Sequence, residues 1–80
     1  MIKVVIYTRP GCHLCEEAKA IIQEARAERP FSLEEVNIDL DPQAADLYRY
    51  DIPVIFINGV KVFKHRVSAR DFIRKLRRLS

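Results

Sequence analysis

The sequence has few of the residues that would extend or staple a small domain. Its 80 residues include only two cysteines and two glycines, and no tryptophan. A chain of this length has room for one hydrophobic core, so we expect a single domain over residues 1–80. No segment approaches the roughly 18 consecutive apolar residues of a membrane helix, and no basic N-terminal region precedes an apolar stretch. We therefore expect neither a membrane span nor a signal peptide, and a cytoplasmic location.

The two cysteines, Cys12 and Cys15, are too close in sequence to act as a structural staple. A bond between residues three apart closes so short a loop that it constrains the unfolded chain little. In a reducing cytoplasm, a Cys-x-x-Cys pair is more often catalytic or metal-binding than structural. The spacing therefore indicates chemistry at this pair.

The pair lies where a strand pattern gives way to a helical one. Pro10-Gly11 ends the apolar run of residues 2–7, after which apolar residues recur at helical spacing: Leu14, Ala18, Ile21, Ile22 and Ala25. Cys12 should therefore begin a helix. Cys15 should lie one turn further on the same face, where the two sulfurs can meet.

Unpaired amide groups and the helix dipole should favour a thiolate on Cys12, as would Arg9 or a protonated His13. We therefore expect the pKa of the Cys12 thiol to lie below the value of ~8.5 for a free thiol. Cys12 is the candidate nucleophile, and Cys15, on the apolar side of the helix, is the candidate resolving thiol. The alternative for His13 is an exposed, mostly neutral imidazole.

The remaining pattern predicts an α/β fold with the order βαβαββα. The predicted strands cover about 2–7, 31–38, 54–57 and 60–67, and the predicted helices about 12 to 26 or 28, 41–50 and 68–79. Asn58-Gly59 predicts a hairpin between the last two strands. The first strand should be central and the second an edge, in a four-stranded mixed sheet with helices on both faces.

The two later helices have recognisable N-terminal signals. Asp41-Pro42 is typical of an N-cap followed by proline, and the buried side of that helix should carry Ala44, Leu47 and Tyr48. Residues 68–71 (Ser-Ala-Arg-Asp) resemble a capping box and should open the last helix.

The segment beyond residue 60 is strongly basic. Asp71 is the one acid among Lys61, Lys64, Arg66, Arg70, Arg74, Lys75, Arg77 and Arg78. Because these cations alternate with helical apolar positions and not with exposed aromatics, we interpret them as a solvated helix face and expect no nucleic-acid partner. His65 should face solvent, since no metal-ligand spacing surrounds it.

Three motifs together resemble a known family. They are Tyr-Thr-Arg-Pro-Gly-Cys-His-Leu-Cys at 7–15, Asp-Ile-Pro-Val at 51–54 and Asn-Gly at 58–59. In this order, over nearly the whole chain, they resemble a glutaredoxin-like member of the thioredoxin superfamily. The resemblance implies a thioredoxin/glutaredoxin-like fold.

The resemblance also implies a substrate site. Pro53 would be cis and pack beside the Cys12 sulfur, leaving the Ile52 backbone to pair with an extended substrate. From the residues alone, the alternative is a trans proline that ends a helix, because only about 5–6% of X-Pro bonds in folded proteins are cis. Arg9 stands where glutaredoxins often carry a lysine that meets a glutathione carboxylate, and His13 and Leu14 complete the expected substrate-binding set.

The chain departs from glutaredoxins at two places. Residues 51–53 replace their usual Thr-Val-Pro, and Phe-Lys-His-Arg at 63–66 stands where they usually carry a Gly-Gly pair. Nor does the chain have the Trp-Cys-Gly-Pro-Cys of thioredoxins.

The leading functional hypothesis is a thiol–disulfide oxidoreductase that reduces protein disulfides or glutathione mixed disulfides. We expect a monomer with no tightly bound cofactor or metal and no membrane partner. Its electron donor would be glutathione or a thioredoxin-reductase-like system. One alternative is a metal or Fe–S site using Cys12, Cys15 and His13, which would need a dimer or outside ligands. Another is a non-catalytic binding module that uses the basic last helix.

Overall fold

A computed structural model describes residues 1–79 and confirms the predicted order of elements. The elements are β1 (Lys3–Thr8), α1 (His13–Glu28), β2 (Ser32–Asn37), η1 (Ile38–Leu40), α2 (Pro42–Tyr48), β3 (Val54–Ile57), β4 (Val60–Lys64) and α3 (Ala69–Leu79). The short 3₁₀ turn η1 is the one element that the pattern did not predict.

The four strands form one mixed sheet in the order β2-β1-β3-β4. β1 runs parallel to β2 and antiparallel to β3, and β3 pairs with β4 through the Asn58-Gly59 turn. The central place of β1 and the edge place of β2 are both confirmed. The continuous apolar run of β1 fits this place because its strand is covered on both faces.

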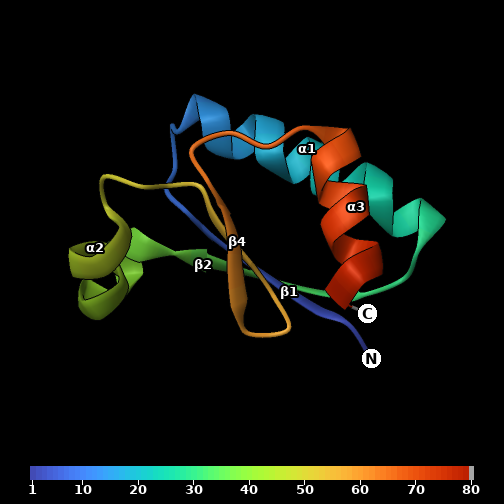
Figure 1. Ribbon diagram of the computed structural model, residues 1–80. Coiled ribbons are helices and arrows are strands. Elements are labelled where there is room, and N and C mark those ends of the chain that lie inside the picture. Colours follow the sequence, from blue (N-terminus) through green and yellow to red (C-terminus); the bar gives the residue numbers. More distant parts are fainter. Residues whose placement is uncertain (80) are drawn as a thin grey trace.

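Helices α1 and α3 lie side by side over one face of the sheet (Figure 1). The core fills the space between them and the sheet. It consists mainly of Val4, Ile6, Ala18, Ile22, Ala25, Phe31, Ile55, Ile57, Phe72 and Leu76. The alternation of β1 and β3 places Val4, Ile6, Ile55 and Ile57 on this face.

Helix α2 lies at one end of the sheet, on the opposite face (Figure 1). Its Tyr48 ring packs on Tyr7 of β1, with centroids 4.6 Å apart, and on Phe56 of β3, at 6.1 Å. Helices therefore cover both faces. The prediction that Leu47 is buried is wrong: the residue is 62% exposed, because α2 turns Ala44 and Tyr48 inward instead.

The last strand ends earlier than predicted, at Lys64 and not at residue 67. His65 adopts a left-handed backbone, with φ of 67°, and leaves the strand direction.

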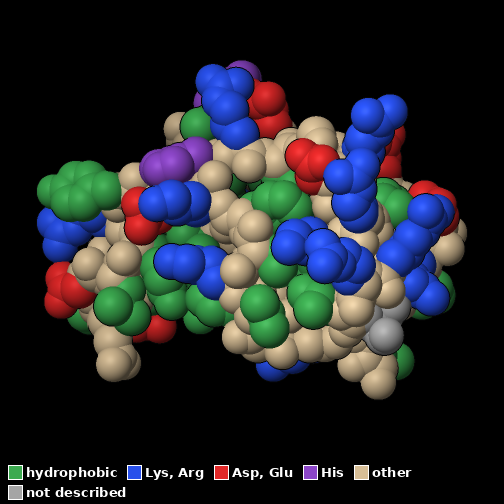
Figure 2. All heavy atoms as spheres, in the orientation of Figure 1, with side chains coloured by type: hydrophobic (Ala, Val, Ile, Leu, Met, Phe, Trp, Pro, Cys, Tyr) green, Lys and Arg blue, Asp and Glu red, His purple; other side chains and the backbone are tan. Residues whose placement is uncertain are grey.

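The capping prediction for α3 is confirmed, since the Asp71 N–H donates to the Ser68 hydroxyl at 3.1 Å. Lys and Arg side chains gather over α3 (Figure 2). No helix within residues 1–79 is both long and apolar enough to span a bilayer.

Candidate functional site

The two cysteines lie at the start of α1, as the pattern predicted. Gly11, with φ of 80°, allows the tight turn in which the Cys12 N–H donates to the Arg9 carbonyl at 3.3 Å. Cys12 is then the N-cap of α1. The Cα atoms of Cys12 and Cys15 are 5.2 Å apart, and their sulfurs are paired in a disulfide.

The surroundings of the two sulfurs differ. Cys12 is partly exposed, and its Sγ accepts the backbone N–H of Cys15 at 3.2 Å. Cys15 is fully buried, with 0% of its surface exposed. A substrate disulfide approaching from solvent can therefore reach Cys12 first, and the helix terminus places an amide donor on its sulfur.

The Ile52-Pro53 bond is cis and the Pro53 side chain is buried. The alternative of a trans proline is therefore wrong. The expected freedom of the Ile52 backbone holds only in part, because its N–H donates to the Tyr48 carbonyl at 3.1 Å. Within residues 1–79 no group donates to the Ile52 carbonyl oxygen. That carbonyl remains as a predicted acceptor for a substrate strand, and the packing of Pro53 beside the Cys12 sulfur stays a prediction.

His65 belongs to this site, although the sequence reasoning placed it only at the surface. Its N–H donates to the carbonyls of Pro53, at 2.9 Å, and Asp51, at 3.2 Å. Its half-exposed imidazole has Nε2 3.9 Å from an Asp51 carboxylate oxygen. The segment after β4 is thus tied to the cis-proline loop. One sequence feature could have revealed this role: His65 lies in the segment where glutaredoxins carry a Gly-Gly pair.

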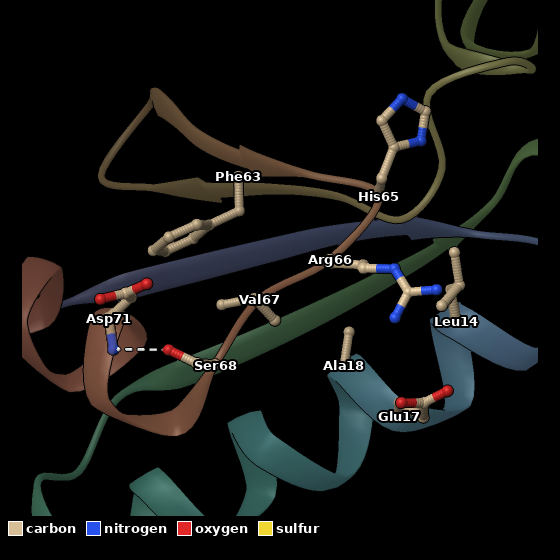
Figure 3. Close-up of a pocket in the computed structure, with 9 residues that line it drawn as sticks. All are labelled: Leu14, Glu17, Ala18, Phe63, His65, Arg66, Val67, Ser68 and Asp71. Atoms are coloured by element: carbon tan, nitrogen blue, oxygen red, sulfur yellow. Dashed lines mark hydrogen bonds between the residues drawn. The ribbon is translucent and has the colours of Figure 1, made fainter.

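A groove of about 320 Å³ runs beside the start of α1 (Figure 3). It is lined by Leu14, Glu17 and Ala18 of α1, by Phe63, His65, Arg66 and Val67, and by Ser68 and Asp71 at the start of α3. The side chains of Arg66 and Leu14 point toward each other across it (Figure 3). Of the predicted substrate-binding residues, Leu14 is the one that lines this groove.

Sequence comparison now decides the family. The model of the glutaredoxin-like domain (DUF836) matches residues 3–77. The chain belongs to this family. A glutaredoxin-like protein of Dictyostelium discoideum, the YDR286C homolog, is 40% identical over 73 residues, which cover 84% of this chain and 68% of that protein. A thioredoxin of Methanocaldococcus jannaschii is 34% identical over 61 residues, covering 72% of each chain.

Solved structures agree with this assignment. The solution structure of protein Ne2328 from Nitrosomonas europaea has a TM-score of 0.79 and 31% identity, covering 94% of this chain and 91% of that one. Solved thioredoxins share the fold. The glutaredoxin-like domain therefore has the predicted thioredoxin-superfamily fold, with a cysteine pair at disulfide distance.

Arg9 and His13, two predicted residues of the glutaredoxin-like site, each lie beside a carboxylate. The Arg9 Nε donates to the Asp39 carboxylate at 2.8 Å, and the Arg9 side chain is 41% exposed. The His13 side chain is 90% exposed, with Nε2 3.3 Å from the Glu17 carboxylate. A substrate carboxylate would have to compete with Asp39 for Arg9, so the substrate-binding roles of Arg9 and His13 stay predictions.

A polar network lies behind the first turn of α1 in the glutaredoxin-like domain. Lys19 donates to Glu16 at 2.7 Å and to Glu35 at 3.0 Å, and the buried Thr8 hydroxyl donates to Glu35 at 3.2 Å. The hydrogen bonds to Glu16 and Glu35 raise the pKa of Lys19 above its usual value. Lys19 therefore stays charged at neutral pH and is no base.

Tyr7 also holds its proton. Burial of its ring, with smaller contributions from Tyr48, Glu34 and Asp41, raises the pKa of the Tyr7 phenol. Tyr7 and Lys19 are therefore both protonated at neutral pH, and neither can act as a general base there.

The described part of the glutaredoxin-like domain, residues 1–79, contains no group of three or more His, Cys, Asp or Glu side chains placed to hold a metal ion. A metal site on this cysteine pair would need ligands from another molecule.

Proposed function

We propose that this glutaredoxin-like domain is a thiol–disulfide oxidoreductase in which Cys12 is the nucleophile and Cys15 the resolving thiol. The observation that carries the proposal is the unequal burial of the pair: the Cys12 sulfur is partly exposed at the helix N-cap, while Cys15 is fully buried one turn inward. The glutaredoxin-like and thioredoxin relatives support the same chemistry.

The reaction has two exchange steps. The Cys12 thiolate attacks one sulfur of a substrate disulfide, the substrate S–S bond breaks, and the departing thiolate takes a proton. The Cys15 thiolate then attacks the Cys12 sulfur of the mixed disulfide. This step releases the second substrate thiol and leaves the Cys12–Cys15 disulfide, so the substrate gains the two electrons that the enzyme loses.

The substrates are disulfides of proteins or mixed disulfides of glutathione. In this proposal an extended substrate chain pairs with the Ile52 carbonyl, and its neighbouring side chains enter the groove between Leu14 and Arg66. Two electrons and two protons must then come from a donor, which is either two molecules of glutathione or a reduced dithiol protein.

The roles of the two thiols are tested by single substitutions. We expect Cys12→Ser to abolish disulfide reduction, because no nucleophile remains at the N-cap. We expect Cys15→Ser to accumulate a covalent mixed disulfide with substrate, visible by mass spectrometry and released by dithiothreitol. Both variants with wild-type turnover would refute the proposal, as would a trapped substrate on Cys15 of the Cys12→Ser variant.

The donor is tested by a comparison of two substrates. Reduction of insulin and of a glutathionylated peptide is measured with glutathione plus glutathione reductase, and separately with a thioredoxin-reductase system. The Arg9 guanidinium is already paired with Asp39, and residues 63–66 stand where glutaredoxins carry the Gly-Gly pair of their glutathione site. Because both features weaken a glutathione site, we expect faster turnover with the thioredoxin-reductase system. Turnover only in the glutathione system, and none in the thioredoxin-reductase system, would contradict this expectation.

A further inference from the structure

A second groove lies between α1 and α3, towards the end of α1 remote from the cysteines. It has a volume of about 600 Å³. Its lining is Glu24, Ala25 and Glu28 of α1 with Ala69, Arg70, Ile73, Arg74, Arg77 and Arg78 of α3. Glu24 is twelve residues beyond Cys12, or roughly 18 Å along the helix axis. An occupant of this groove would leave the Cys12 sulfur open to substrate.

The charges along the groove are unbalanced. On the α1 side, Glu28 pairs with Arg77 at 3.1 Å. Arg70 and Arg74, one turn apart on α3, are exposed and form no ion pair with any residue in the range 1–79. Figure 2 shows the resulting band of Lys and Arg side chains over α3. The groove therefore presents a basic wall on which Arg77 is paired with Glu28, while Arg70 and Arg74 have no ion pair within residues 1–79.

The floor of the groove is apolar and its other wall is acidic. Ala25 is buried and Ile73 is half-buried at the base, while Glu24 faces the groove from α1. A single strand of nucleic acid would find no aromatic ring to stack on in this groove. An amphipathic helix with carboxylates along one edge matches the apolar floor and the basic wall, because its apolar side chains fit the floor and its acids meet Arg70 and Arg74, on the wall opposite Glu24.

We propose that this groove docks an acidic amphipathic helix of a partner protein. The acids of that helix lie over the α3 wall and its apolar side chains lie over Ala25 and Ile73. The inference does not depend on the redox proposal, since the groove shares no residue with the cysteine site.

The probe is a synthetic 18-residue amphipathic peptide with Leu on one stripe and Glu beside it. It is titrated into the full-length ¹⁵N-labelled protein and followed by amide shifts. We expect saturable shifts confined to residues 24–28 and 69–78, weaker binding at higher salt, and at least tenfold weaker binding to Arg70→Glu/Arg74→Glu. The matched control is Lys61→Glu/Lys64→Glu, an equal charge change on β4, which should bind the peptide as the wild type does.

Several outcomes would overturn the proposal. These are no saturable shifts, equal weakening by the β4 variant, equal binding of the same peptide with Lys in place of Glu, or tighter binding of a DNA duplex or phosphatidylserine vesicles to the same residues. Disulfide reduction by the Arg70→Glu/Arg74→Glu variant should stay at the wild-type rate, so failure of docking and failure of the redox chemistry are distinguishable.

Discussion

At the scale of single residues, His65 adopts a backbone conformation that L-residues rarely take. Its φ of 67° lies in the left-handed region, which costs a non-glycine residue roughly 1–2 kcal/mol. The conformation directs the His65 N–H to the Pro53 and Asp51 carbonyls. These hydrogen bonds offset the cost, so His65 holds the cis-proline loop against the end of β4.

Glycine and alanine at position 65 should therefore differ in a predictable direction. We expect His65→Gly to be more stable than His65→Ala by about 1 kcal/mol, because both lose the imidazole and only glycine relieves the left-handed strain. The free energy of unfolding in urea measures the difference. At Lys64, the last residue of β4, the glycine and alanine variants should rank in the opposite order, with alanine the more stable. An alanine variant as stable as the glycine variant at position 65 would contradict the strain.

The sequence was informative at some of these residues and silent at others. Cys12 at the helix start and buried Cys15 followed from a break in an apolar run and from helical spacing, which are local signals. The cis form of Pro53 came from family resemblance. The turn at His65 depends on hydrogen bonds to Pro53 and Asp51, which lie 12 and 14 residues earlier, and no local pattern encodes those bonds. The donation of the Ile52 N–H to Tyr48, four residues earlier, is local but was not predicted.

At the scale of elements, Lys19 ties α1 to the edge strand β2. Its ammonium group meets Glu16 on its own helix and Glu35 across to β2, and its side chain is 27% exposed. These contacts raise the pKa of Lys19 above 10.5. The stabilisation they give is therefore complete below pH 10.5, the unfolded value, and is lost as pH rises through the higher folded pKa.

Removing this charge should show that pH dependence. We expect Lys19→Met to lower the free energy of unfolding by about 1 kcal/mol at pH 7, and the deficit to shrink above pH 10.5. Urea unfolding of both proteins between pH 7 and 11.5 tests this. Lys61→Met, an exposed cation with no ion pair to any of residues 1–79, should show little change at any pH. A deficit for Lys19→Met that is constant with pH would assign the effect to packing.

Helix α2 shows where element prediction loses accuracy. The strands, the hairpin and the two long helices follow from periods of 2.0 and 3.6 residues that persist over many positions. In the seven residues of α2 the apolar positions fit more than one face, and Leu47 was assigned to the wrong one. The Tyr48 ring decides the orientation by packing on Tyr7 of β1 and Phe56 of β3, both of which lie outside the helix.

At the scale of the whole molecule, the main hydrophobic cluster and the cysteine pair are largely separate. The main cluster lies between the sheet and the α1–α3 pair. Cys15 is fully buried but is not a member of this cluster, and the first turn of α1 places its Cα 5.2 Å from that of Cys12. The Cys12–Cys15 bond closes a loop of only four residues. In the chain-entropy model such a loop contributes at most roughly 2 kcal/mol, against a total stability of about 4–12 kcal/mol for a domain of this size.

Reduction should therefore leave the fold intact, and the proposed redox function requires this. We expect the free energy of unfolding to fall by no more than roughly 2 kcal/mol in dithiothreitol, and amide shifts to change only for residues near Cys12, Cys15 and Pro53. A Cys12→Ser/Cys15→Ser variant should match the reduced protein in both measurements. Loss of spectral dispersion across the whole sheet on reduction would show instead that the bond holds the domain together. It would turn a pair assigned to electron transfer into a structural one.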